Sequence, residues 1–168
     1  MGTMTSSGGG LAKSVSIRRA KLDDAAAIAD CLGTAFAPYR DQYTPDAFRD
    51  TTLSVDGVQQ RIAQMTLLVA IDGRGSVVGT VAYRVVAAGH GHLRGMAVLP
   101  EWRGSGAAAE LLAVAEQEMR QLGVSRVTLN TTRPLDRAAR FYAKAGYVRT
   151  DTVADYHGMP LFEFAKTL

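Results

Sequence analysis

Hydrophobic and polar positions follow two periods along the chain, and they predict a protein of interspersed strands and helices. A two-residue alternation, or a short apolar run bounded by turn residues, predicts a strand, whereas apolar positions three to four residues apart predict a helix. About seven strands are expected, in chain order over 14–19, 66–71, 76–86, 92–99, 124–131, 147–155 and 161–166. Helices are expected over 24–37, over 44–65 with a break at 54–57, over 104–122 and over 135–145.

Turn residues connect these elements in a way that determines most of the sheet. Asp72-Gly73-Arg74-Gly75 is a strong hairpin signal, so strands 66–71 and 76–86 are expected to pair antiparallel, and strand 92–99 continues this meander. The next helix is a crossover that places strand 124–131 parallel to strand 92–99. We therefore predict an α/β (α+β) fold with a mixed, mostly antiparallel sheet, a central parallel pair and helices on both faces.

Length and composition indicate one globular domain. The chain has 168 residues, of which 47% are hydrophobic and 21% charged, as in folded proteins of ordinary domain size. Residues 1–13 begin with a run rich in Gly, Ser and Thr, so we expect a flexible tail there and a single domain over 14–168. No apolar run approaches the ~20 residues of a membrane span, and no secretory signal is recognisable. The one cysteine, Cys31, fits a reducing compartment, so a cytoplasmic location is expected.

The formal charge is only slightly positive, at +3 from 19 basic and 16 acidic residues. No basic run stands out, so neither nucleic acid nor a membrane is expected as a partner. A small basic excess suits an anionic small ligand equally well. A single cysteine also argues against a zinc site built from cysteines, and no metal is expected.

The segment 96–108 carries the most informative chemistry of the sequence. A strand ends at Pro100, a loop with glycines follows, and a helix begins. The start of a helix offers N–H groups without internal partners and the positive end of the helix dipole. Gly104 and Gly106 have no side chain that would hold an anion away, and Arg103 adds a positive charge. The segment is therefore suited to a diphosphate group.

Two common phosphate motifs do not fit this segment. No lysine follows the second glycine as in a P-loop, and Ala109 stands where the third glycine of a dinucleotide-binding turn belongs. On the glycines alone, a simple turn into the helix is the better interpretation.

A resemblance to a known family changes that interpretation. Residues 103–108, Arg-Gly-Ser-Gly-Ala-Ala, match R-x-x-G-x-A, which resembles the acyl-coenzyme-A signature Q/R-x-x-G-x-G/A of the GNAT superfamily of N-acetyltransferases. Residues 141–147, Phe-Tyr-Ala-Lys-Ala-Gly-Tyr, are similar to a second segment of that family, aromatic-Tyr-x-K-x-G-aromatic. The element order fits the family from residue 14 to the end, and the specific motifs lie mainly within 92–147.

The resemblance implies a V-shaped opening between the two central parallel strands, in which acetyl-CoA binds as the cosubstrate. Backbone groups of Met96, Ala97 and Val98 would bond its pantetheine arm, because paired strands have no free N–H groups to offer. The pyrophosphate would lie on a loop and helix start formed by Arg103, Gly104, Ser105, Gly106, Ala107 and Ala108. Leu135 stands where the family often has an asparagine that bonds the arm. Asn130 could take that role, or it is simply a polar residue at a strand end.

Two side chains are candidates for the chemistry that the resemblance implies. Tyr142 would donate a proton or a hydrogen bond to the departing thiolate, and the alternative is a core aromatic residue. His92 would be the base, because family members carry Glu or His there and histidine titrates near neutral pH. The alternative for His92 is a solvent-facing residue beside a turn. Unless a bulge intervenes, alternation places His92, Arg94, Met96 and Val98 on one face.

The predicted function is transfer of an acetyl group from acetyl-CoA to a primary amine by direct attack in a ternary complex. The acceptor would be a small molecule or a protein amine, and Asp41, Asp46 or Asp50 could attract its ammonium group. Cys31 is interpreted as a core thiol, because direct transfer needs no cysteine nucleophile. The alternative function is a non-catalytic CoA-binding or sensory module of the same fold, which would not need Tyr142.

The last two predicted strands form a hairpin around His157-Gly158. Residues 147–166 would then form one edge of the sheet, and an unpaired edge is a liability that proteins commonly cover. We therefore also expect a homodimer, as is frequent in the family.

Overall fold

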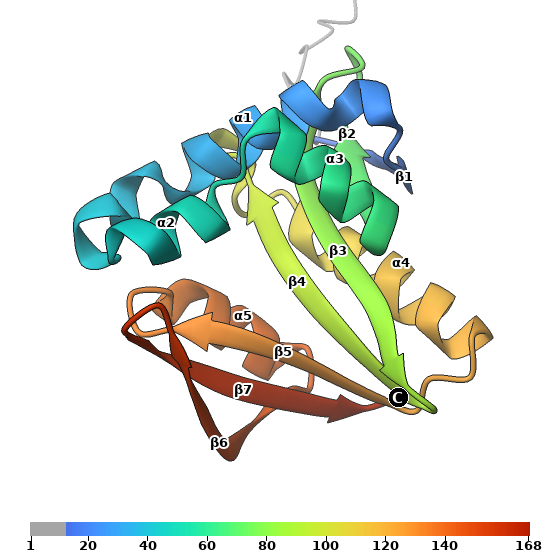
Figure 1. The fold of residues 1–168 in the computed structure, drawn as a ribbon. Helices are drawn as coiled ribbons and strands as arrows, with labels where there is room; N and C mark the ends of the chain where they lie inside the picture. The colour runs from blue at the N-terminus through green and yellow to red at the C-terminus, as the bar shows by residue number, and fades with distance from the viewer. Residues whose placement is uncertain (1–12) are drawn as a thin grey trace, which may run out of the picture.

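The computed structural model describes residues 13–168, whose seven strands form one sheet in the order β1-β2-β3-β4-β5-β7-β6. The strands are β1 (Ser16–Arg19), β2 (Thr66–Ile71), β3 (Val77–Ala87), β4 (His90–Val98), β5 (Arg126–Thr132), β6 (Val148–Tyr156) and β7 (Met159–Thr167). β4 and β5 are parallel and the other neighbours are antiparallel, so the predicted fold class is confirmed (Figure 1). The predicted tail lies outside the described residues apart from Lys13, whose Nζ donates a hydrogen bond to the Glu101 carbonyl.

The two predicted hairpin turns are present. The Asp72 carboxylate accepts hydrogen bonds from the amides of Arg74 and Ser76, both at 2.9 Å, and so closes the turn between β2 and β3. Between β6 and β7, His157 and Gly158 have φ values of 49° and 87°. Two successive positive φ values are typical of a tight hairpin turn whose twist matches that of the strands.

The parallel strands β4 and β5 pair only at their beginnings. Residues 90–92 of β4 pair with residues 126–128 of β5, and the pairing stops there. β3 and β7 continue to pair along the outer sides of these two strands as far as Val98 and Thr132. In Figure 1, β4 and β5 leave a common corner near the C-terminus and diverge as a V. The facing backbone groups of the diverging parts therefore have no strand partner.

Helices cover both faces of the sheet. They are α1 (Ala25–Phe36), α2 (Pro45–Thr51), α3 (Val55–Gln64), α4 (Ala107–Gln121) and α5 (Asp136–Lys144). α1 and α3 pack on one face around the buried residues Ile28, Leu32 and Val58, and α4 packs on the other around Leu111 and Met119. Figure 1 shows α5 behind β5, on the same side of the sheet as α4.

Helix ends follow from local chemistry. Thr44 and Ser54 each accept a hydrogen bond from the amide three residues further on, so the predicted break at 54–57 is the start of a new helix. α4 begins at Ala107, whereas the sequence had indicated a start at Gly104. The reason is that Gly104 and Gly106 have φ values of 77° and 90°, which a right-handed helix cannot contain.

The C-terminal hairpin lies at one end of the sheet, but only half of it is an edge. β7 lies between β5 and β6, so the expectation that all of 147–166 forms an edge is wrong and β6 alone has an unpaired side. β6 exposes Val148 and Val153, whose surfaces are 70% and 53% accessible. Within residues 13–168, no helix has the length and apolar character needed to cross a membrane.

Candidate active site

A cleft of about 980 Å³ opens where β4 and β5 diverge. Its walls come from both strands, from the loop before α4 and the start of that helix, and from α2, α3 and α5. The predicted site residues that line it are His92, Met96, Ala97, Val98, Arg103, Gly104, Gly106, Ala107, Ala108, Asn130 and Tyr142. Of the predicted set, only Ser105 does not line the cleft. The fold thus brings both candidate catalytic residues and the candidate cofactor loop to one cavity.

The start of α4 presents a backbone surface free of side chains. A Cβ atom placed on Gly104 or Gly106 would meet no heavy atom within 4 Å, so both glycines border open space. The first amides of the helix lack intrahelical partners, and the helix dipole adds partial positive charge. A diphosphate fits this surface, and a side chain at either glycine would occupy the space that the diphosphate needs.

Arg103 and Ser105 belong to the same loop but have different surroundings. Arg103 is exposed, lines the cleft and makes no ion pair with any other residue of 13–168. Ser105 is turned into the loop, where its hydroxyl donates to the Trp102 carbonyl at 2.5 Å and accepts from the Ala107 amide at 3.3 Å. The Ser105 side chain therefore stabilises the loop itself.

A bulge in β4 changes which side chains share a face. Gly95 has a φ of 66°, and the register between β3 and β4 shifts at this point. Arg94, before the bulge, reaches α2 on one side of the sheet, whereas Met96 and Val98, after it, pack into the core beneath α4. The expected common face of these residues and His92 is therefore wrong, because the bulge reverses the alternation.

Tyr142 lies on α5 with its ring in the core and its hydroxyl at the cleft. The residue is 6% exposed, and its ring packs edge-to-face against Phe141 and Tyr147 at centroid distances of 5.2 and 5.7 Å. No polar side-chain atom of the described residues is both fully buried and without a partner, which leaves the hydroxyl in contact with the cleft. Burial raises the pKa of Tyr142 well above its usual value, so the hydroxyl remains a hydrogen-bond donor.

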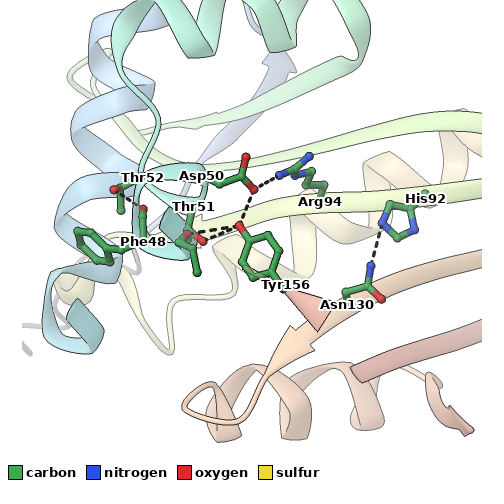
Figure 2. Close-up of polar contacts among 9 residues, drawn as sticks. Phe48, Asp50, Thr51, Thr52, His92, Arg94, Asn130 and Tyr156 are labelled. Carbon is green, nitrogen blue, oxygen red and sulfur yellow. Dashed lines mark hydrogen bonds and ion pairs between the residues drawn. The ribbon is translucent and has the colours of Figure 1, made fainter. Parts of the chain in front are cut away.

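His92 is held by hydrogen bonds at both ring nitrogens. Its Nδ1 lies 2.8 Å from Thr128 Oγ1, and its Nε2 lies 3.4 Å from Asn130 Nδ2, a contact drawn in Figure 2. Because Asn130 Nδ2 can only donate, Nε2 is the acceptor and Nδ1 carries the proton that is donated to Thr128. The Thr128 hydroxyl then donates to His90 Nε2 at 2.8 Å. A continuous chain of hydrogen bonds thus runs from His92 to His90.

The surroundings of His92 keep its imidazole neutral. Burial lowers the pKa of His92 below its ordinary value of 6.5, and the neighbouring His90, Arg84 and Arg94 act in the same direction. Glu163 acts in the opposite direction and has the smallest effect of these groups. A neutral imidazole with a lone pair on Nε2 is the form that general-base catalysis requires.

Leu135 stands where the resemblance implied an asparagine, and Asn130 is the residue considered for the same role. Both line the cleft. The Asn130 amide is directed at His92, and its backbone belongs to β5. Leu135 immediately precedes α5 and presents an apolar side chain to the cleft.

Sequence reasoning missed a polar cluster on the opposite wall of the cleft. Asp50 Oδ2 accepts hydrogen bonds from Arg94 Nη2 at 2.6 Å and from the Tyr156 hydroxyl at 2.5 Å (Figure 2). The Thr51 hydroxyl lies 3.1 Å from the same Tyr156 hydroxyl. These residues come from α2, β4 and β6, so no local motif marks the cluster. The sequence had indicated Asp50 only as a possible partner of an ammonium group, and Arg94 only as a residue that shares the strand and the alternation of His92.

The three aspartates considered for an acceptor ammonium group are placed differently. Asp41 and Asp46 are exposed and do not line the cleft, and Asp46 pairs with Arg49 at 2.9 Å. Asp50 does line the cleft, but its carboxylate is already bonded to Arg94 and Tyr156. The only carboxylate in the described lining of the cleft is therefore that of Asp50, and Arg94 already neutralises its charge.

Cys31 is a buried core residue of α1. Burial raises the pKa of its thiol to about 12, so the reactive thiolate does not form at neutral pH. Among residues 13–168, no group of three or more potential metal ligands comes together.

Solved structures of similar fold include several N-acetyltransferases. The PaiA N-acetyltransferase of Thermoplasma acidophilum, in complex with coenzyme A, is 20% identical, with a TM-score of 0.76 over 92% of this chain and 99% of that chain. The ribosomal-protein-alanine N-acetyltransferase of Brucella melitensis is 20% identical, with a TM-score of 0.72 over 91% and 99% of the two chains. A GCN5-related N-acetyltransferase of Rhodopseudomonas palustris is 21% identical, with a TM-score of 0.74 over 92% and 96%. At these identities the similarity establishes a shared fold.

Sequence comparison with whole families is more specific. No curated protein matches the chain by sequence. The sequence model of the acetyltransferase (GNAT) family matches residues 28–147, a range that includes the cleft-forming strands β4 and β5 and both motifs, 103–108 and 141–147. The match covers most of the chain, and together with the fold it shows that this protein belongs to the acetyltransferase (GNAT) family.

Proposed function

We propose that this protein transfers an acetyl group from acetyl-CoA to a primary amine by direct attack in a ternary complex. The observation that carries the proposal is the single cleft where the bare start of α4, the neutral imidazole of His92 and the hydroxyl of Tyr142 meet. Family membership supports the acyltransferase class, and the coenzyme A complex of the Thermoplasma protein supports the cosubstrate. We infer that residues 14–168 act as one catalytic domain.

Acetyl-CoA supplies an activated thioester and, in this proposal, binds along the opening between β4 and β5. The unpaired edge of β4 at Met96, Ala97 and Val98 offers backbone groups to the pantetheine arm. The start of α4 holds the diphosphate, and Arg103 adds a charge beside it. Backbone donors at Met96 or Val98 would also stabilise negative charge on the carbonyl oxygen.

His92 prepares the amine for attack. An alkylammonium group has a pKa of about 10, so the amine must lose a proton before its nitrogen lone pair can form the new N–C bond. Nε2 of His92 accepts this proton once the amine replaces the long hydrogen bond from Asn130, at 3.4 Å. Nδ1 can then pass its own proton to Thr128, and Thr128 can pass one to His90. The chain of hydrogen bonds thus moves positive charge from the cleft toward His90.

Tyr142 assists the departure of the thiolate. As the N–C bond forms and the C–S bond breaks, the electron pair of the C–S bond goes to sulfur. Tyr142 donates a hydrogen bond to this sulfur. Because burial raises the pKa of Tyr142, its proton stays on oxygen, and the thiolate takes its own proton from solvent.

The experiment that tests the proposal combines the full chain, acetyl-CoA and pooled primary amines, and follows free thiol release together with the mass of the acetylated amine. We expect release that depends on one or more amines. Stabilisation of the protein by CoA without acetylation of any amine would contradict the proposal and favour a non-catalytic CoA-binding module.

We also propose that the protein forms a homodimer through β6. The strand is an unpaired edge and exposes two valines, a combination that further pairing would cover. Light scattering that finds a monomer at every concentration would contradict this assembly. The free thiol of Cys31 supports a cytoplasmic location.

A further inference from the structure

The cleft carries an excess of positive charge. Its lining contains one acidic residue, Asp50, and the five arginines Arg61, Arg84, Arg94, Arg103 and Arg137. Arg103 and Arg137 belong to the loop before α4 and to α5, on the side assigned to the cosubstrate. Arg61, Arg84 and Arg94 belong to α3, β3 and β4, on the side left for the acceptor. The positive charge of the cleft therefore extends beyond what the diphosphate needs.

Arg61 is the unusual member of this group. Its residue surface is only 9% exposed, yet its guanidinium makes no hydrogen bond or ion pair with any other residue of 13–168. The guanidinium lies against the bulge in β4, where a Cβ placed on Gly95 would stand 2.8 Å from Arg61 Nη1. No fully buried side-chain nitrogen or oxygen of the described residues lacks a partner, so the unpaired nitrogens of this mostly buried arginine face the cleft. Charges that are largely removed from water are normally paired, because their desolvation is costly.

The neighbours of Arg61 do not supply its counter-charge. Asp50 is hydrogen-bonded to Arg94 and to Tyr156, so Arg94 already compensates its negative charge. Burial, together with the positive charge of Arg94, lowers the pKa of Arg61 to about 10 in spite of the opposite effects of Asp50 and Tyr156. The site therefore has a donor set for an anion and no anion of its own.

We propose that the acceptor amine is a small amino carboxylate and that Arg61 binds its carboxylate, an inference that rests on the acetyltransferase function proposed above. A planar guanidinium can hold both oxygens of a carboxylate through two parallel N–H···O bonds. Arg61 lies against the bulge at Gly95, three residues from His92 in β4, and both Arg61 and His92 line the cleft, so one amino carboxylate can place its carboxylate on Arg61 and direct its amine toward His92. A polyamine, whose charges are all positive, would face three arginines on this side of the cleft.

The first arm of the test uses matched amines that differ only in the anion. The full-length wild-type protein is assayed with acetyl-CoA and each L-amino acid, β-alanine and γ-aminobutyrate, each beside its own carboxamide. Hydrogen bonds to charged groups predict that the carboxylate form of the best pair has a kcat/KM about 10- to 100-fold above that of its amide. A carboxamide or a polyamine that is acetylated as well as or better than every carboxylate would overturn the inference while leaving the acetyltransferase function intact. Failure of every amine would overturn both.

The second arm uses Arg61→Met, which keeps most of the side-chain length and removes the charge. We expect the KM for the best carboxylate acceptor to rise about 10- to 100-fold, with an unchanged KM for its amide and an unchanged Kd for CoA. Arg61→Lys should recover part of the loss. Arg49→Met is the matched control, because Arg49 is an exposed arginine of α2 that pairs with Asp46 outside the cleft.

A purely structural role for Arg61 predicts other results. It predicts a lower Tm for Arg61→Met and equal losses with the carboxylate and with the amide. Our inference predicts a Tm close to or above that of the wild type, because the mostly buried Arg61 has no hydrogen bond or ion pair with the described residues that the variant would break. Equal losses on both members of the pair would overturn the inference.

Discussion

The two walls of the cleft are built by different means. The wall assigned to acetyl-CoA is one continuous stretch, residues 103–108, which acts through backbone amides, two glycines and the start of a helix. The wall assigned to the acceptor is assembled from side chains of α2, α3, β4 and β6, namely Asp50, Arg61, Arg94 and Tyr156. The first design suits the diphosphate of the proposed cosubstrate. The second places the choice of acceptor in side chains that can change without disturbing cosubstrate binding.

The largest effect on CoA binding is expected from Gly106→Val, on the cosubstrate wall. The valine side chain would occupy the open space at the start of α4, and the loss of two charged hydrogen bonds should weaken CoA binding by about 100-fold or more. Calorimetric titration with CoA measures this change.

The matched control for that variant is Gly123→Val, at the other end of α4. Gly106 and Gly123 have φ values of 90° and 81°, and neither has an atom within 4 Å of an added Cβ. Both variants should lose roughly 1–2 kcal/mol of stability through left-handed strain. Only Gly106→Val should lose CoA affinity. Equal losses of affinity in the two variants would show that the diphosphate does not bind at the start of α4.

The second prediction concerns His92, which stands between the two walls. His92→Gln removes the base, so kcat/KM should fall about 10²- to 10⁴-fold while CoA affinity is unchanged. In the wild type the active form is the neutral imidazole, and its pKa is lowered from 6.5. The acidic limb of the kcat/KM profile should therefore have its midpoint below pH 6.5 and should be absent from the variant.

His157→Asn is the control for His92→Gln. His157 is exposed in the β6–β7 turn at a φ of 49°, a conformation that asparagine adopts easily. The control should keep the wild-type rate and pH profile. A wild-type limb centred above pH 6.5, or the same limb in His92→Gln, would show that another group is the base.

The smallest effect is expected from Arg103→Glu. Arg103 is exposed, and exposed ion pairs contribute little, so reversal of its charge should weaken CoA about 5- to 10-fold. Pantetheine, which lacks the phosphates, should bind the variant and the wild type equally. A similar loss for both ligands would mean that Arg103 does not contact a phosphate.

The same comparison explains what the sequence could predict. Period-two alternation and the Asp72 turn predicted the strands and their antiparallel order, because these signals are local. The cosubstrate wall could also be predicted from the sequence, because its glycines, its arginine and its helix start follow one another between Arg103 and Ala108. Functional residues that are consecutive in the sequence can be recognised before the fold is known.

The acceptor wall could not be predicted because its contacts are made only by folding. Arg61 lies on a helix whose sequence is largely polar, where an arginine indicates a solvated face, but in the fold its guanidinium lies against the bulge of β4 and the residue is buried. Gly95 posed a different problem. A glycine within a strand can be an ordinary strand residue or a bulge, and the bulge reversed the alternation from which the faces of β4 were deduced.

The central claim is that acetyl transfer takes place in the cleft between β4 and β5 with the hydroxyl of Tyr142 at the departing sulfur. Tyr142→Phe removes this hydroxyl and keeps the packed ring, so CoA affinity and Tm should change little. The decisive measurement is the single-turnover rate of acetyl transfer to the best acceptor, because slow product release cannot mask it. The account predicts a fall of about 10²- to 10³-fold, the range for loss of one hydrogen-bond donor to developing charge, with an unchanged Kd for acetyl-CoA. An unchanged single-turnover rate would contradict it and would leave Tyr142 a packing residue of α5.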